Sequence, residues 1–173
     1  MQSTVWTIGH STRQLSEFLS IIAAYDIDLI VDVRRYPGSR RLPHFASQPL
    51  EESLAGAGIS YLWVPSLGGR RRPDPNSVNT GWRHPAFRGY ADYTASEEFA
   101  SGLFELQMLS GGLRVAIMCA EVLWWRCHRR IIADVLTSLG TEVVHIRDES
   151  SAEVHELANP ARIVGGRLTY AET

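Results

Sequence analysis

Short apolar runs alternate along the chain with segments in which apolar residues recur at helical spacing. The runs at 4–8, 29–33, 59–64, 113–119 and 142–146 have the length and composition of buried strands. Apolar residues repeat every three or four positions over 15–25, 95–110 and 131–139, and residues 49–58 form a shorter helix with a glycine stop. This alternation predicts an α/β fold, with a mainly parallel sheet of about five strands flanked by helices.

Two segments interrupt this alternation. Residues 65–91 have no period of their own, and long irregular loops in compact domains are often functional. The aromatic residues Trp82, Phe87 and Tyr90 favour a loop that packs, so we expect a lid over a site. The tail at 150–173 is less regular, and we expect a short helix at 152–158. A chain of 173 residues holds one sizeable core, which predicts a single domain over 1–173.

Composition changes this picture little. The chain is 45% hydrophobic and 21% charged, with a formal net charge of −2, which argues against a polycation that coats nucleic acid. No apolar run approaches a membrane span and no secretory signal opens the chain, so we expect a cytoplasmic protein without a membrane partner. The two cysteines fit a reducing compartment better than a disulfide framework. All 17 basic residues are arginines, whose forked donors suit phosphate and carboxylate oxygens.

Polar, glycine-rich and arginine-rich residues follow four of the predicted strands. They form the stretches GHSTR (9–13), DVRRYPGSRR (32–41), PSLGGRRR (65–72) and CAE (119–121). Because ligands bind outside the carboxyl ends of parallel strands, this coincidence predicts a binding pocket at that edge of the sheet.

The residues at the first three strand ends allow a structural and a functional interpretation. His10 fits a general base or a hydrogen-bonded filler, whereas Ser11 has capping-box spacing with Gln14. Asp32 lies inside an apolar strand and Arg34 points to the same sheet face, which predicts an ion pair or a direct role at the site. Gly68 and Gly69, before three arginines, are compatible with a backbone turn around an anion or with a plain flexible turn.

The densest chemistry lies in the stretch IMCAEVLWWRCHRR, residues 117–130. Cys119 ends a strand, where a thiolate nucleophile or a small buried side chain would fit. Six residues separate Cys119 from Arg126, one more than in a phosphatase or rhodanese loop. Cys127 lies on the apolar stripe of the next helix, which favours core packing, and His128 is expected against the sheet.

The arginines of this stretch have two expected roles. Arg126 and Arg129 are three residues apart, close to a helix start, where they would grip an anion. Arg130 has an expected i,i+4 ion pair with Asp134.

A metal site is a weaker alternative for the same stretch. Cys119, Cys127 and His128 supply ligand types for zinc, with His10 and Glu121 as further donors. Their spacing matches no common zinc motif, and a Cys119–Cys127 disulfide would lack the CxxC form of thiol oxidoreductases. We therefore assign no metal from the sequence, and the cofactor stays unknown.

The motifs TIGHS, LIVDVRRYPGSRR with PHF, GISYLWVPSLGG, FRGYADY and MCAEVLWWRCHRRIIADVL occur in this order between about residues 7 and 146. With these motifs in this order, the chain resembles the prokaryotic family catalogued as domain of unknown function 488. A proline is common in the gap between CAE and CHR in that family, where this chain has Leu123, Trp124 and Trp125. The resemblance implies a compact α/β domain and no particular reaction. The positions that it marks are His10, Ser11, Asp32, Arg34, Gly68, Gly69, Arg88, Tyr90, Cys119, Glu121, Cys127, His128 and Arg129.

Three functions follow from these observations. The first is an enzyme for a small anionic, phosphate-containing or nucleotide-like substrate. Its catalytic candidates are His10, Cys119, Glu121 and His128, and its anion-binding candidates are Asp32, Arg34, Gly68, Gly69, Arg88, Tyr90, Arg126 and Arg129. The second is a nucleic-acid-binding, repair-associated protein that uses the arginines and aromatics of 65–91. The third is a thiol-redox or metal-binding protein that uses Cys119 and Cys127. The oligomeric state is not predicted.

Overall fold

A computed structural model describes residues 3–173 of the chain. The central sheet has the order β3-β2-β4-β1-β5-β6, in which the first five strands are parallel and β6 is antiparallel to β5. Its strands are β1 (Thr4–Gly9), β2 (Leu29–Asp32), β3 (Ser60–Trp63), β4 (Val115–Cys119), β5 (Glu142–Ile146) and β6 (Ala152–Val154). The single α/β domain and its mainly parallel sheet confirm the predicted fold class.

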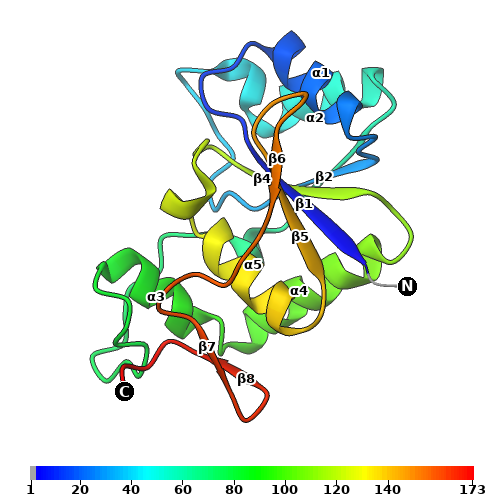
Figure 1. Ribbon diagram of the computed structural model, residues 1–173. Coiled ribbons are helices and arrows are strands. Elements are labelled where there is room, and N and C mark those ends of the chain that lie inside the picture. The colour runs from blue at the N-terminus through cyan, green and yellow to red at the C-terminus, as the bar shows by residue number, and fades with distance from the viewer. Residues whose placement is uncertain (1–2) are drawn as a thin grey trace.

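Helices cover both faces of the sheet (Figure 1). They are α1 (Leu15–Ala24), α2 (Ser47–Gly56), α3 (Pro85–Tyr93), α4 (Glu97–Ser110) and α5 (Arg129–Ser138), with short 3₁₀ turns at η1 (Pro43–Phe45), η2 (Pro65–Leu67) and η3 (Trp124–Arg126). One buried cluster joins α1 and α2 to the sheet, and a second joins α3, α4 and α5 to the opposite face.

The two-residue period of the strands decides which side chain meets which helix layer. In β4, Val115, Ile117 and Cys119 belong to the cluster with α5, whereas Ala116 and Met118 belong to the cluster with α1. All five are buried, because β4 lies between β2 and β1 and is covered on both faces. This alternation directs Cys119 toward α5.

The structure corrects the expectation for residues 65–91. The segment contains η2 and the helix α3, which begins at Pro85, directly after His84 at the N-cap. Tyr90 and Trp82 are buried in the cluster with α5, so the segment packs as the aromatics predicted. The irregular part is therefore shorter than 65–91, and proline at the first helical position explains where the helix starts.

The predicted helix at 152–158 is wrong. Residues 152–154 instead form β6, which pairs with β5, and the tail continues as a small antiparallel hairpin of β7 (Arg162–Val164) and β8 (Arg167–Thr169). Alanine, glutamate and leucine in this stretch are good helix formers, but pairing with the edge of the sheet overrides that weak preference.

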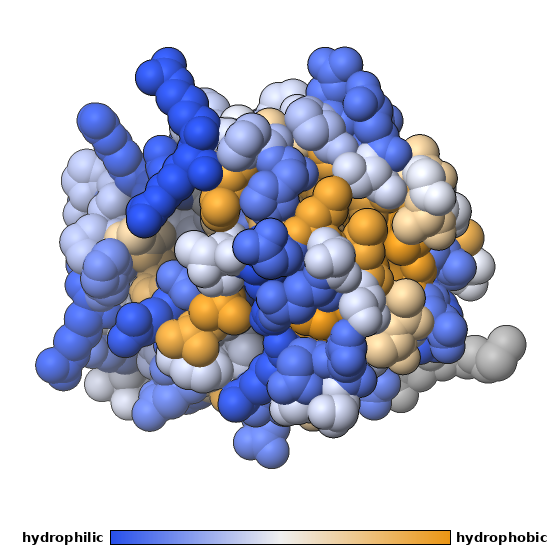
Figure 2. Space-filling view, turned by 90° about the horizontal axis from the view of Figure 1, so that it is seen from above, coloured by the Kyte–Doolittle hydropathy of each residue, from blue (hydrophilic) through white to orange (hydrophobic). Residues whose placement is uncertain are grey.

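The surface seen from above is largely hydrophilic, with hydrophobic side chains visible between charged ones (Figure 2). Within residues 3–173, no helix is both long enough and apolar enough to cross a bilayer.

Candidate functional site

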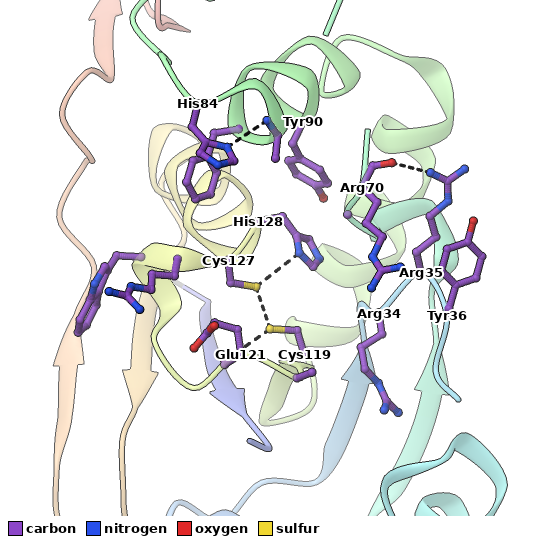
Figure 3. Close-up of a pocket in the computed structure, with 16 residues that line it drawn as sticks. Arg34, Arg35, Tyr36, Arg70, His84, Tyr90, Cys119, Glu121, Cys127 and His128 are labelled. Carbon is purple, nitrogen blue, oxygen red and sulfur yellow. Dashed lines mark hydrogen bonds between the residues drawn. The ribbon is translucent and has the colours of Figure 1, made fainter. Parts of the chain in front are cut away.

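A cavity of about 670 Å³ opens beside the carboxyl ends of β2 and β4, as the strand-end residues predicted (Figure 3). Its walls come from the loops after these strands, residues 69–70, α3, and the turn that leads into α5. The residues that line it are Arg34, Arg35, Tyr36, Gly69, Arg70, His84, Ala86, Phe87, Tyr90, Cys119, Ala120, Glu121, Trp125, Arg126, Cys127 and His128.

Two cysteines and a histidine form one wall of this cavity (Figure 3). The Sγ atoms of Cys119 and Cys127 are 2.8 Å apart, and Cys127 Sγ lies 3.4 Å from His128 Nδ1. Both cysteines are free thiols, and each is less than a tenth exposed. The seven residues between them in the sequence include the turn η3, which brings the start of α5 back to the end of β4.

The imidazole of His128 is held in one orientation. Its Nε2 lies 2.9 Å from the carbonyl oxygen of Val33. A carbonyl oxygen can accept a hydrogen bond but cannot donate one, so Nε2 carries the hydrogen. In the neutral ring, Nδ1 is then the acceptor that faces Cys127 Sγ. Gly69 allows this placement, because a Cβ at Gly69 would lie 2.9 Å from His128 Nδ1.

The surroundings of the thiol pair favour one thiolate. Burial alone would raise the pKa of Cys127, but the hydrogen bond from Cys119 and the neighbouring His128 and Arg129 together hold that pKa well below its ordinary value. Burial, together with the hydrogen bond and negative charge of Cys127, raises the pKa of Cys119. From the sequence, Cys119 is a candidate nucleophile or a small buried side chain and Cys127 has a packing role, whereas this geometry favours Cys127 as the thiolate.

Arginines form the facing wall (Figure 3). Arg35 donates to the carbonyl of Arg70 at 2.7 Å, and both guanidinium groups lie within 6 Å of the Tyr36 ring centre. Arg126 lies on the cysteine side, in the turn η3 directly before Cys127. It is exposed and has no side-chain hydrogen bond or ion pair within the described part of the chain. Arg126 is therefore available for a ligand in the cavity.

His10, Asp32 and Arg34 lie together toward the opposite face of the sheet. Asp32 and Arg34 form a buried ion pair at 2.6 Å, which confirms the structural interpretation of that pair. Arg34 also donates to the carbonyl of Phe45 at 2.7 Å, and His10 stacks on the Phe45 ring with ring centres 4.3 Å apart. Arg34 reaches the edge of the cavity, whereas His10 and Asp32 do not line it.

The imidazole of His10 is committed to its surroundings. Its Nδ1 lies 2.8 Å from the carbonyl of Ser11. Burial lowers the pKa of His10 to about 4, so the ring is neutral at pH 7. This neutral, packed imidazole fits the hydrogen-bonded filler better than a base for Cys127.

The remaining predicted residues divide between the cavity and its support. Glu121 is exposed at the cavity edge, where its carboxylate accepts from the backbone N–H of Leu123 at 3.1 Å. Tyr90 lines the cavity, and its hydroxyl donates to the carbonyl of Leu67 at 2.7 Å. Gly68 is buried against the backbone of Arg35 and lies outside the lining.

Arg88 and Arg129 lie outside the lining of the cavity as well. Arg88 donates to the carbonyl of Trp82 at 2.8 Å. Arg129 is almost completely buried and donates to Thr7 Oγ1 at 3.2 Å, so it does not share an exposed face with Arg126.

Two smaller expectations were wrong. Ser11 does not cap α1: its φ is 48°, the helix begins at Leu15, and Gln14 stands at the N-cap without a side-chain bond. Arg130 does not pair with Asp134, because it lies over the ring of Trp82 at 4.8 Å, while the Asp134 carboxylate faces buried partners.

Several lining residues escaped the sequence analysis, namely Arg35, Tyr36, Arg70, His84 and Trp125. Arg35, Tyr36, Arg70 and Trp125 lie inside the quoted stretches, and His84 lies in the irregular segment 65–91, so the signal is the cluster itself. Their places follow from loop conformations that no periodicity encodes. Among residues 3–173, no group of three or more His, Cys, Asp or Glu side chains is arranged to hold a metal ion.

Comparison with known protein families identifies the chain. The family model described as "Domain of unknown function DUF488" matches residues 14–136. The chain belongs to the DUF488 family. The match includes β2, β3 and β4 and most of α5, and therefore the cysteine–histidine wall of the cavity. The searches of curated proteins and of solved structures gave no match.

Proposed function

We propose that this DUF488 protein is an enzyme that binds a small anionic, phosphate-containing substrate in the 670 Å³ cavity and attacks it with the Cys127 thiolate. The observation that carries the proposal is the contact of Cys127 with His128, opposite a wall of arginines. A nucleophile, a base and a third group that orients the base are the parts that covalent catalysis requires, and the Val33 carbonyl is that third group.

Each residue has a step in this chemistry. His128 Nδ1 takes the thiol proton of Cys127, and the thiolate forms a bond to the electrophilic centre of the substrate as the leaving group departs. The imidazolium returns its proton to the leaving group. Water then breaks the bond between sulfur and substrate, and Glu121 at the cavity edge is placed to accept a proton from that water.

The anion would lie between Arg126 on the cysteine side and the arginines of the facing wall. Arg126 is free of protein partners within the described residues, and Arg70 lies across the cavity beside Tyr36. Charge-assisted bonds from guanidinium groups are the strongest neutral-pH contacts that a protein offers to phosphate. The rings of Tyr36, Phe87 and Trp125 supply apolar surface for a nucleotide-like substituent.

The nucleic-acid alternative is less well supported. It depended on aromatic residues of 65–91 stacking on bases, but Trp82 is 5% exposed and Tyr90 is 1% exposed. Both rings pack in the core with α5, and Phe87 contacts Trp82 at 5.1 Å between ring centres. A duplex or single strand would meet the arginines of this segment without that stacking platform.

The test measures the rate at which iodoacetamide alkylates Cys127 between pH 4 and pH 9, followed by mass spectrometry of the modified peptide. We expect an apparent pKa well below 8.5, the value of an unperturbed thiol, and an increase in that pKa in His128→Asn. Inorganic phosphate or adenosine monophosphate should slow the alkylation of the wild-type protein.

Two arginine variants distinguish anion binding in the cavity from a nonspecific effect of the protein's positive charge. Arg126→Ala removes charge-assisted bonds of about 1.5–3 kcal/mol, so the anion concentration that gives half protection should rise about 10- to 100-fold. Arg72→Ala, an exposed arginine that does not line the cavity, should leave protection unchanged. An ordinary pKa at Cys127 together with no protection by either anion would refute the proposal.

A second candidate is thiol–disulfide exchange with a small anionic disulfide, which the contact of the two Sγ atoms favours. The Cys127 thiolate would attack the disulfide and release one thiolate, leaving a mixed disulfide on Cys127. Cys119 would then attack the Cys127 sulfur, releasing the second thiolate and forming a Cys119–Cys127 disulfide. An external dithiol would reduce that bond and complete the cycle.

Oxidised glutathione is the probe for this second candidate. The exchange predicts that the wild-type protein releases two equivalents of glutathione and forms an internal disulfide, while Cys119→Ser stops at the mixed disulfide. Alkylation without any exchange in the wild-type protein would remove this candidate and leave the first in place.

A further inference from the structure

A chain of buried hydrogen bonds runs from α5 through the edge of the sheet and returns to the cysteine pair. Asp134 Oδ1 lies 2.8 Å from His155 Nε2, and His155 Nδ1 lies 2.9 Å from His145 Nε2. His145 Nδ1 lies 2.7 Å from Thr7 Oγ1, which accepts from Arg129 Nη1 at 3.2 Å. All five side chains are at least 95% buried. None of them lines the 670 Å³ cavity.

The bonds of this chain have one consistent direction. A carboxylate only accepts, so His155 Nε2 carries a hydrogen and its Nδ1 accepts from His145 Nε2 when the ring is neutral. His145 Nδ1 then accepts from the Thr7 hydroxyl, whose oxygen accepts from Arg129. Burial, followed by the neighbouring His155, lowers the pKa of His145 to about 2, which agrees with a neutral His145 ring. Every donor therefore points from Arg129 toward Asp134.

Arg129 is a buried cation that contacts no carboxylate in the described part of the chain. Its Nη2 donates to the carbonyl of Glu121, and its Nε has no hydrogen-bond partner within the described residues. Its backbone N–H lies 3.5 Å from Cys127 Sγ. The Sγ of Cys119 contacts the same Glu121 carbonyl, at 3.6 Å, which places the guanidinium beside the thiol pair. Burying a charge is costly unless an opposite charge lies near it. The charges of Cys119 and Cys127 outweigh the effect of burial and raise the pKa of Arg129.

We infer that Thr7, His145, His155 and Asp134 are positioning residues that hold the Arg129 guanidinium behind the Cys119–Cys127 pair. The Asp134 end of the chain is fixed by further donors, since the Tyr170 hydroxyl and the backbone N–H of Ala158 both bond to the carboxylate. The inference rests on the proposed function, because it explains how the reactive thiolate is stabilised.

Trp124 covers the middle of the chain. Its ring stacks on His145 with centres 4.1 Å apart and an angle of 3° between the planes, and its Nε1 donates to Glu153 at 2.5 Å. This tryptophan lies in the gap between the CAE and CHR motifs. The gap residue therefore serves to shield the His145–His155 bond from water, which strengthens it.

The alkylation profile of Cys127 reports the position of Arg129. The titratable groups that face Cys127 are Cys119 from β4, His128 and Arg129 from α5, and Tyr90 from α3. None of these is changed by a substitution at Thr7. A shift in the profile of a Thr7 variant therefore reports a change in the guanidinium that Thr7 contacts.

The test compares Thr7→Val, which removes the hydroxyl at nearly constant volume, with Thr7→Ser, which keeps it. Thr7→Val should raise the apparent pKa of Cys127 by about one unit, which makes alkylation about tenfold slower below that pKa. Thr7→Ser should restore the wild-type profile. Thr137→Val removes another buried hydroxyl, one with no hydrogen-bond partner among residues 3–173, and should leave the profile unchanged.

A second variant acts farther from the thiols. His155→Asn keeps an acceptor for His145 but loses the bond to Asp134, and it should shift the profile in the same direction by a smaller factor. An unshifted profile in both Thr7→Val and His155→Asn would overturn the inference while the wild-type profile still supports the proposed function. An ordinary pKa in the wild-type protein would instead overturn the proposed function itself.

Discussion

The substitution Asp32→Asn should destabilise the protein strongly. Asp32 is fully buried and Arg34 is 8% exposed, and the Arg34 guanidinium donates to both carboxylate oxygens at 2.6–3.1 Å. Asparagine keeps the shape but removes the charge, so Arg34 is left as a buried cation with no other carboxylate in contact. Breaking one side of a buried ion pair costs about 3–5 kcal/mol. The Tyr61 hydroxyl, which donates to Asp32 at 2.6 Å, also loses its charged acceptor.

Urea unfolding followed by circular dichroism measures this loss. With an m-value of about 2 kcal/mol/M, the expected loss lowers the midpoint by about 1.5–2.5 M. Glu17→Gln breaks the exposed i,i+4 pair with Arg13 and should change stability by no more than about 0.5 kcal/mol. The double variant Asp32→Asn with Arg34→Met should recover part of the loss, since no buried charge remains. A loss below about 1 kcal/mol in Asp32→Asn would refute the reasoning.

Three further predictions concern close packing and pH. Gly69→Ala brings a Cβ within 2.9 Å of His128 Nδ1, so the imidazole must shift and thiol alkylation near pH 6 should slow severalfold, with unfolding measured to confirm the fold. The unfolding free energy should fall by on the order of 3 kcal/mol through His10 as the pH decreases from 6.5 to 4, because the unfolded imidazole binds a proton near pH 6.5 and the folded one only near pH 4. His10→Gln should make the unfolding free energy, measured in urea titrations, less dependent on pH. An unchanged pH dependence would contradict the assignment. Gly89→Ala would place a Cβ 2.2 Å from the carbonyl oxygen of Arg71, which should cost at least about 1–3 kcal/mol and lower the melting temperature.

The strands and long helices were predictable because burial in this fold is periodic. The five parallel strands appear in the sequence as apolar runs, and the observed bounds differ from the predicted ones by at most two residues. The edge strand β6 was not predictable, because three residues with helix-forming neighbours gain their conformation only from pairing with β5. The same holds for α3, where Gly89 and the aromatic residues pack against segments distant in sequence.

The position of the cavity is predictable from the strand ends, and the candidate residues divide between the two faces of the sheet. Strand alternation alone separates Asp32 from Val33 and Met118 from Cys119, and so assigns Asp32 to the face with α1 and Cys119 to the face with α5. Counting this alternation from the sequence would have separated His10 from the cysteines. The contact between Cys127 and His128 depends on how the turn η3 folds, which no local pattern encodes.

The arginines after Trp125 show why residue type alone does not assign a role. Arg126 is exposed at the cavity, Arg129 is buried behind the thiols, and Arg130 lies over the ring of Trp82. Because successive residues at a helix start point in different directions, three similar side chains enter three environments. A buried guanidinium such as that of Arg129 can stabilise only charges inside the protein, whereas an exposed one at the cavity, such as that of Arg126, can contact a ligand. On this separation we base the proposal that Arg129 stabilises the thiolate and that Arg126 binds the anion.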